Sequence, residues 1–99
     1  MKKRLVVYPA IFDDNGNTPG VYSVEFSDVP EALTYGNGMA EALKRAPEAL
    51  GLSLYEQKKL PTPSDFNQLK RSNPNVTINL ITVDLEQIKS QAKIKNTMF

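Results

Sequence analysis

The hydrophobic pattern along the chain predicts four strands and one main helix. Residues 5–12 are apolar at nearly every position, which is typical of a strand covered on both faces. Residues 21–26 and 76–83 alternate apolar with polar side chains, and a short run at 33–35 ends at a glycine. Across residues 39–50, apolar side chains recur at spacings of four, three and four, which indicates an amphipathic helix capped by Asn37 or Gly38.

Two prolines conflict with these elements. Pro9 lies inside the first strand, where it cannot donate a ladder hydrogen bond, so we expect a bulge or a locally broken ladder there. Pro47 lies inside the helix and removes the bond to the carbonyl of Leu43. We therefore expect a kink near residues 43–47.

The connecting segments have their own signals. Residues 13–20 contain Asn-Gly and Pro-Gly and predict a hairpin between the first two strands. Residues 58–75 are rich in Pro, Ser and Asn and predict a loop with one helical turn at 66–69, capped by residue 64 or 65. Residues 85–90 are expected to add a helical turn or two, and residues 93–99 to form a basic, extended end.

These elements predict an α+β fold with a small mixed sheet. The first three strands form an antiparallel meander, and the fourth joins it in parallel through a right-handed helical crossover. The main helix covers one face, so the doubly apolar first strand needs small helical segments or a second subunit on the other. We assign residues 1–91 to one domain and residues 92–99 to a basic extended tail.

Composition excludes several classes of site. The chain has 99 residues and neither Cys nor His, so it cannot build a zinc finger, a Ser-His-Asp triad or a thiol nucleophile. The lack of disulfides fits a reducing cytosol. Pro9 interrupts the apolar start, and no apolar stretch reaches the roughly 18 residues that would span a membrane. We expect a cytoplasmic protein that needs no metal or cofactor.

Charge is unevenly distributed along the chain. The net charge is +1, yet residues 5–56 hold eight acidic and two basic residues, a net of −6, which leaves +7 for the two ends. Such asymmetry points to a basic partner for the acidic stretch and an anionic one for the ends.

Three stretches carry a resemblance to a known family. "YPAIFDD", "GVYSVEFSDVP" and "TYGNGMAEALKRAPEAL" resemble the HicB antitoxin family, and "LPTPSD" and "INLITVDL" extend the likeness over nearly the whole chain. Departures are Ser27 in place of a proline, Glu31 and Ala32 in place of glycine-cysteine, and Pro47 in the helix. The matching positions are Tyr8, Pro9, Ala10, Gly20, Tyr22, Val24, Phe26, Asp28, Pro30, Thr34, Gly36, Glu41, Ala42, Leu43, Ala46, Glu48, Ala49 and Leu50.

The resemblance implies an incomplete ribonuclease H-like fold that sequesters HicA, a small basic toxin that cleaves messenger RNA. On this reading the protein is a non-catalytic antitoxin and a homodimer or higher oligomer. Many family members add a C-terminal DNA-binding domain for autoregulation. The ending "AKIKNTMF" looks like the first strand of such a domain, so the chain is either truncated or a natural short form. We expect truncation, and DNA binding only when that domain is present.

The acidic residues fit two different sites. The alternative functions are a metal-dependent ribonuclease and a DNA-binding autoregulator that acts through a missing C-terminal domain. The ribonuclease needs several converging carboxylates, for which residues 13, 14, 25 and 28 are the candidates. An acidic surface that attracts a cationic toxin is the preferred interpretation, although a solvated rim explains any single acid. The residues expected to contact the toxin are Glu25, Asp28, Glu31 and Glu41.

Two further groups have alternative interpretations. Tyr22, Phe26 and Tyr35 fit either the core or a platform for single-stranded RNA, and the shared face of Tyr22 and Phe26 favours the core. Lys93 and Lys95 fit either contacts to DNA phosphates or a solvated tail.

Overall fold

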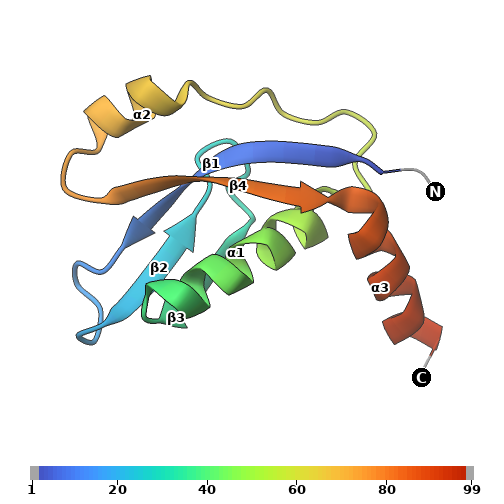
Figure 1. Ribbon diagram of the computed structural model, residues 1–99. Helices are drawn as coiled ribbons and strands as arrows, with labels where there is room; N and C mark the ends of the chain where they lie inside the picture. The colour runs from blue at the N-terminus through green and yellow to red at the C-terminus, as the bar shows by residue number, and fades with distance from the viewer. Residues whose placement is uncertain (1–2, 98–99) are drawn as a thin grey trace.

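The structure is a computed structural model that describes residues 3–97, with side chains as far as residue 92. Within that range the chain forms four strands and three helices (Figure 1). In chain order they are β1 (Leu5–Asp13), β2 (Val21–Glu25), β3 (Leu33–Asn37), α1 (Met39–Leu54), α2 (Phe66–Ser72), β4 (Thr77–Asp84) and α3 (Leu85–Thr97). None of these helices combines the length and the apolar character needed to cross a membrane.

The strands form one open sheet in the order β3-β2-β1-β4, and every neighbouring pair is antiparallel. The α+β class and the meander of the first three strands are therefore confirmed. The predicted parallel fourth strand is wrong, because Leu5 lies opposite Asp84 and Phe12 lies opposite Thr77. The incomplete ribonuclease H-like arrangement, which was expected to include that parallel strand, is not supported by this sheet.

The long connection between α1 and β4, residues 55–76, explains the direction of β4. α1 ends near the end of the sheet where β1 begins, and the connection then runs back along the sheet to α2 at the opposite end (Figure 1). β4 therefore starts beside the end of β1 and returns antiparallel to it. A direct crossover from the helix would have given the parallel pair.

Side-chain hydrogen bonds fasten this returning connection. The Tyr8 hydroxyl donates to the carbonyl of Pro61 at 2.6 Å. Ser64 donates from its backbone N–H and from its hydroxyl to the two carboxylate oxygens of Asp28. Burial raises the pKa of the Tyr8 phenol above its usual 10.0, and the nearby Asp28 carboxylate adds to that rise.

One face of the sheet packs against α1 and forms the core. β1 contributes Tyr8, Ala10 and Phe12 to this face, and α1 contributes a stripe of small and aliphatic side chains at helical spacing. The buried core residues are Tyr8, Ala10, Phe12, Val24, Phe26, Val29, Ala32, Ala42, Ala46, Leu50, Leu54, Ile81, Val83, Leu85 and Ile88.

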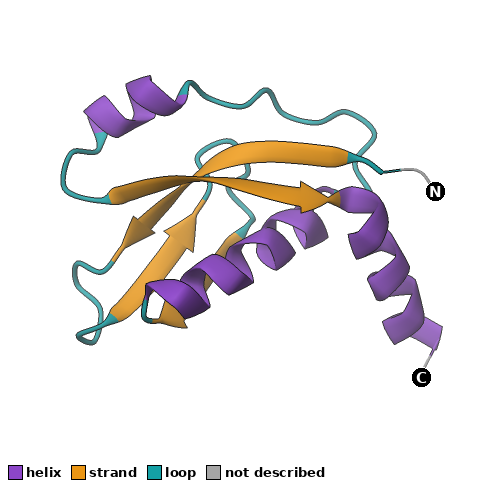
Figure 2. Ribbon diagram, viewed as in Figure 1, coloured by secondary structure: helices purple, strands orange, loops and turns teal. Residues whose placement is uncertain are grey.

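The opposite face is covered in part. α2 lies on the side of the sheet away from α1 (Figure 2), and Pro9, Ile11 and Ile78 are buried on this face. Leu5, Val7 and Leu80 share this face and are 62%, 43% and 56% exposed. The expectation that small helical segments cover the second face is therefore met only in part.

The helix caps follow the sequence signals. Gly38, one of the two predicted caps of α1, precedes the helix with a left-handed φ of 86°. Asp65 caps α2 by accepting a hydrogen bond from the N–H of Asn67 at 3.0 Å.

Neither proline stops its element. β1 pairs with β4 without a bulge across residues 5–12. The Arg4 carbonyl accepts from the N–H of Leu85, just after β4, so the backbone alternation along β1 turns the nitrogen of Pro9 toward β2. The pairing of β2 with β1 ends at Ile11, so the missing donor falls where this ladder has already stopped. α1 continues through Pro47 as one helix.

Asp84 joins the end of β4 to the start of α3. Its Oδ1 accepts from the N–H of Arg4 at 3.0 Å and from the N–H of Glu86 at 3.1 Å. The hydrogen bond from Arg4 is the largest cause that holds the pKa of the Asp84 carboxyl below its usual 3.8, and the bond from Glu86 adds to it.

The C-terminal element differs from the expectation. α3 continues to Thr97, so the predicted extended conformation is wrong for residues 93–97, which are helical. The sequence from Leu85 to Thr97 contains good helix formers and neither Pro nor Gly, so nothing ends the helix at residue 90. The side chains of Lys93 and Lys95 lie outside the described part of the structure, and their proposed DNA contacts stay predictions.

Candidate partner-binding surface

β3 forms one outer edge of the sheet. The N–H of Gly38 donates to the carbonyl of Gly20 at 2.7 Å, which fixes the backbone alternation between β3 and β2. The backbone groups of Leu33, Tyr35 and Asn37 consequently point away from the sheet. They form the part of this edge that a neighbour can reach.

Two side chains of α1 form hydrogen bonds with backbone groups on this edge. Arg45 donates to the carbonyl of Tyr35 at 3.2 Å, and its guanidinium lies 5.4 Å from the centroid of the Tyr35 ring. Glu41 accepts from the N–H of Asn37 at 2.9 Å and lies 3.5 Å from Arg45. The start of α1 is thereby held against the strand.

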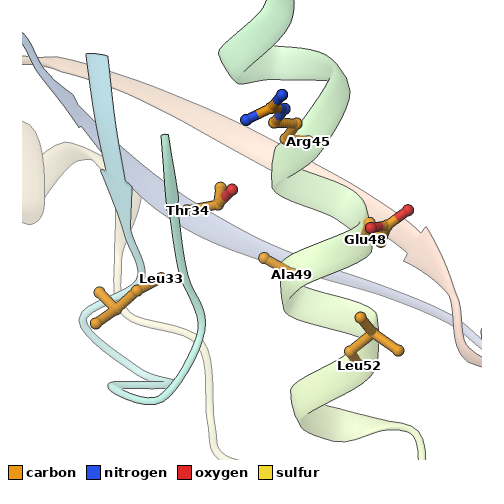
Figure 3. A pocket seen from close by; sticks show the side chains of 6 residues that line it. All are labelled: Leu33, Thr34, Arg45, Glu48, Ala49 and Leu52. Carbon is orange, nitrogen blue, oxygen red and sulfur yellow. The ribbon is translucent and has the colours of Figure 1, made fainter. Parts of the chain in front are cut away.

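An open groove lies between β3 and α1. Thr34 and Ala49 face each other across it (Figure 3), whereas the Leu33 side chain points away from α1. Leu33 and Leu52, one on each side of the groove, are 65% and 50% exposed. The complete lining consists of Leu33, Thr34, Arg45, Glu48, Ala49 and Leu52.

Three exposed acidic residues lie in this groove or near Leu33. Glu25 lies directly across from Leu33 in the β2–β3 pair, Glu31 is exposed two residues before that leucine, and Glu48 lines the groove. Exposed apolar side chains beside charged ones are typical of a protein interface. We call Glu25, Glu31, Leu33, Glu48 and Leu52 the β3 surface.

Two predicted contact residues have internal partners instead of a free carboxylate. Asp28 accepts both hydrogen bonds from Ser64, and Glu41 accepts from Asn37 and pairs with Arg45. Of the four acids expected to meet a toxin, Glu25 and Glu31 are therefore the exposed pair beside the groove.

Sequence reasoning missed the apolar part of this surface. Leu52 lies beyond the helical pattern of residues 39–50, and Leu33 was assigned only to a short strand. Glu48 was counted in the acidic total but was not singled out. The strand's position at the edge of the sheet would have marked Leu33, but that position follows from the topology.

The carboxylates considered for a metal site are separated along the sheet. Asp13 lies at the hairpin end of β1 and accepts from the N–H of Asn15 at 2.8 Å, whereas Asp28 follows the other end of β2. Among the described residues, no group of three or more acids is placed to hold a metal ion.

The aromatic residues divide between core and surface. Phe26 is buried, and Tyr22 is half-buried against the core, as their shared strand face predicted. Tyr35 is 59% exposed on the β3 edge, beneath Arg45. One exposed ring does not form the platform considered for single-stranded RNA.

A solved structure has a similar fold. It is a toxin–antitoxin complex. The match is to a chain of the complex from Streptococcus pneumoniae, with 29% sequence identity and a TM-score of 0.67, over 85% of this chain and 72% of that chain. No family model matches the present sequence, and no curated protein matches it.

Proposed function

We propose that this protein is the antitoxin of a toxin–antitoxin pair and that it covers a basic, RNA-cleaving toxin of the HicA type. The observation that carries the proposal is the likeness to a chain of a toxin–antitoxin complex, at 29% identity over 85% of this chain. The sequence motifs that resemble the HicB family support the antitoxin role and the HicA partner.

The β3 surface is the docking site in this proposal. A toxin that cleaves RNA carries positive charge to hold phosphates, and Glu25, Glu31 and Glu48 supply the opposite charge near the exposed side chains of Leu33 and Leu52. The acids speed the encounter and compete with RNA for the toxin, while the leucines slow dissociation.

Binding to the candidate toxin tests this assignment. The partner is the short basic protein encoded in the neighbouring reading frame, and association is measured at low and moderate salt. Leu33→Ala is expected to weaken binding about tenfold through faster dissociation. Glu25→Gln combined with Glu31→Gln is expected to slow association severalfold at low salt and to flatten the salt dependence.

Asp14→Asn is the matched control, because it removes one acid from the hairpin loop, at the opposite end of β2 from the turn that follows Glu25. It should leave both rate constants unchanged. Failure to bind at low salt would defeat the proposal. Equal effects of the control and of the Glu25→Gln, Glu31→Gln variant would show that the toxin binds elsewhere than on the β3 surface.

No bond-breaking step is assigned to this chain. Purified protein incubated with labelled RNA and Mg²⁺ or Mn²⁺ is expected to leave the RNA intact. Cleavage that disappears in Glu25→Gln and Asp28→Asn would instead establish the metal-dependent ribonuclease.

A further inference from the structure

β4 forms the other outer edge of the sheet, and its outward backbone groups have no partner in the described structure. The N–H of Leu85 donates to the carbonyl of Arg4, so alternation turns the backbone groups of Ile78, Leu80 and Thr82 away from β1. No hydrogen bond within the described residues reaches these outward groups. The edge is regular and ready to pair.

This edge lacks the features that keep natural edge strands apart. It runs for eight residues, pairs with β1 without a bulge, and has no charged residue, Pro or Gly from Thr77 to Val83. Exposed edges of this kind normally carry a lysine, a proline or a bulge, unless another strand covers them. We therefore expect another strand to pair with the β4 edge.

We propose that the covering strand is β4 of a second copy, paired antiparallel about a two-fold axis at Leu80. The two sheets then become one continuous sheet with the β4 strands at its centre. In this register Leu80 lies opposite Leu80 of the other copy and Ile78 lies opposite Thr82. A shift to the next register that preserves the hydrogen-bonding alternation would, in one direction, place Ile78 opposite Asp84, against which apolar burial argues. The same shift in the other direction would pair only residues 77–81 of each β4 strand.

Charge and apolar exposure favour a second copy over a cationic partner. The uncharged stretch from Thr77 to Val83 offers nothing to attract a basic toxin, whereas two identical uncharged strands meet without like-charge repulsion. Leu80 also shares a sheet face with the exposed side chains of Leu5 and Val7. Pairing brings this apolar stripe of one copy next to the same stripe of the other and shields it.

The oligomeric state of the isolated protein tests the pairing without any toxin. Sedimentation equilibrium is expected to give twice the chain mass of 11.0 kDa for the wild type. Leu80→Lys places two like charges opposite each other at the axis and should return the mass to that of one chain. Leu33→Lys changes an exposed leucine on the other edge, and the mass of this variant should remain doubled. Circular dichroism verifies that both variants are folded.

A cysteine cross-link tests the register. The chain has no Cys, so Leu80→Cys introduces a single thiol. Hydrogen-bonded antiparallel residues have Cα atoms about 5.5 Å apart, within the range that a disulfide spans. Oxidised Leu80→Cys should migrate as a covalent dimer, and Leu33→Cys should not.

Three results would overturn the pairing. The first is a wild-type protein that has the mass of a single chain even at high protein concentration. The second is a doubled mass that persists in Leu80→Lys. The third is a Leu80→Cys variant that cross-links no better than Leu33→Cys. If the wild type is monomeric and Leu80→Lys weakens toxin binding, β4 is a toxin contact instead. Because the mass measurement uses no toxin, its failure leaves the antitoxin assignment standing.

Discussion

The two edge strands of the sheet, β3 and β4, differ in whether their outward backbone groups are hydrogen-bonded. β3 is five residues long, and side chains of α1 bond two of its outward groups, those of Tyr35 and Asn37. β4 is eight residues long, and the outward backbone groups of Ile78, Leu80 and Thr82 have no partner among the described residues. A short, side-chain-occupied edge suits a partner that docks through side chains, whereas a long bare edge suits a partner that adds a strand.

The surroundings of the two edges reinforce this difference. Glu25, Glu31 and Glu48 make the β3 side acidic, and the β4 strand is uncharged as far as Val83. Electrostatic steering therefore acts on one edge and apolar self-pairing on the other. In this scheme the two proposed partners, a basic toxin and a second copy, do not compete.

The largest expected effect comes from separating α1 from β3. Gly36 is buried where the helix crosses the strand, and an added Cβ would meet the backbone N of Ala42 and lie 2.7 Å from its Cα. Because backbone atoms cannot yield as a flexible side chain does, Gly36→Ala should lower the free energy of unfolding by about 1–3 kcal/mol. Urea denaturation followed by circular dichroism measures it.

Asn37→Ala is the control for this substitution. It changes the next residue of the same strand, whose side chain is exposed and whose N–H still donates to Glu41. Its effect should stay within about 0.5 kcal/mol. If both variants lower the free energy of unfolding equally, the close approach of α1 to Gly36 does not explain the loss.

Local chemistry in the sequence was sufficient to predict most elements. The hairpin turn, the cap at Gly38 and the cap at Asp65 depend on residues a few positions apart, and each was predicted correctly. The direction of β4 was not, because it depends on where residues 55–76 lie. That path is held by contacts between distant residues, such as Tyr8 with Pro61. No local pattern encodes those pairs.

The candidate site was predictable to a similar extent. The acidic stretch and the exposed pair Glu25 and Glu31 came from counting charges. The bonds that occupy Asp28 join it to Ser64, 36 residues away along the chain, and could not be predicted by counting.

An intermediate effect is expected where β4 ends. Asp84→Ala removes the acceptor of the N–H groups of Arg4 and Glu86, so the urea midpoint should fall, by less than in Gly36→Ala. Asp84→Asn keeps an acceptor and should lie closer to the wild type at neutral pH. If the two variants are equally destabilised at neutral pH, these bonds do not hold the end of the edge.

Melting temperatures measured at acid pH distinguish the contribution of the Asp84 charge from that of its hydrogen bonds. Its pKa is lowered in the folded state, so its charge contributes stability that is complete above the usual 3.8 and is lost as the pH falls through the lower folded value. The difference in melting temperature between wild type and Asp84→Asn should therefore shrink as the pH is lowered below about 3.8. A constant difference across that range would contradict the lowered pKa.

The smallest effect on stability, and the sharpest test of the comparison, concerns Arg45. Arg45→Ala removes a half-exposed donor to Tyr35 and should change the free energy of unfolding by only about 0.5 kcal/mol. It also bares the Tyr35 carbonyl, which makes β3 resemble β4. In a Leu80→Lys background, where β4 cannot self-pair, Arg45→Ala should therefore restore association, visible as a rise in mass with concentration. If that double variant stays monomeric, the side chains of α1 are not what protects the β3 edge, and its short length is the sufficient cause.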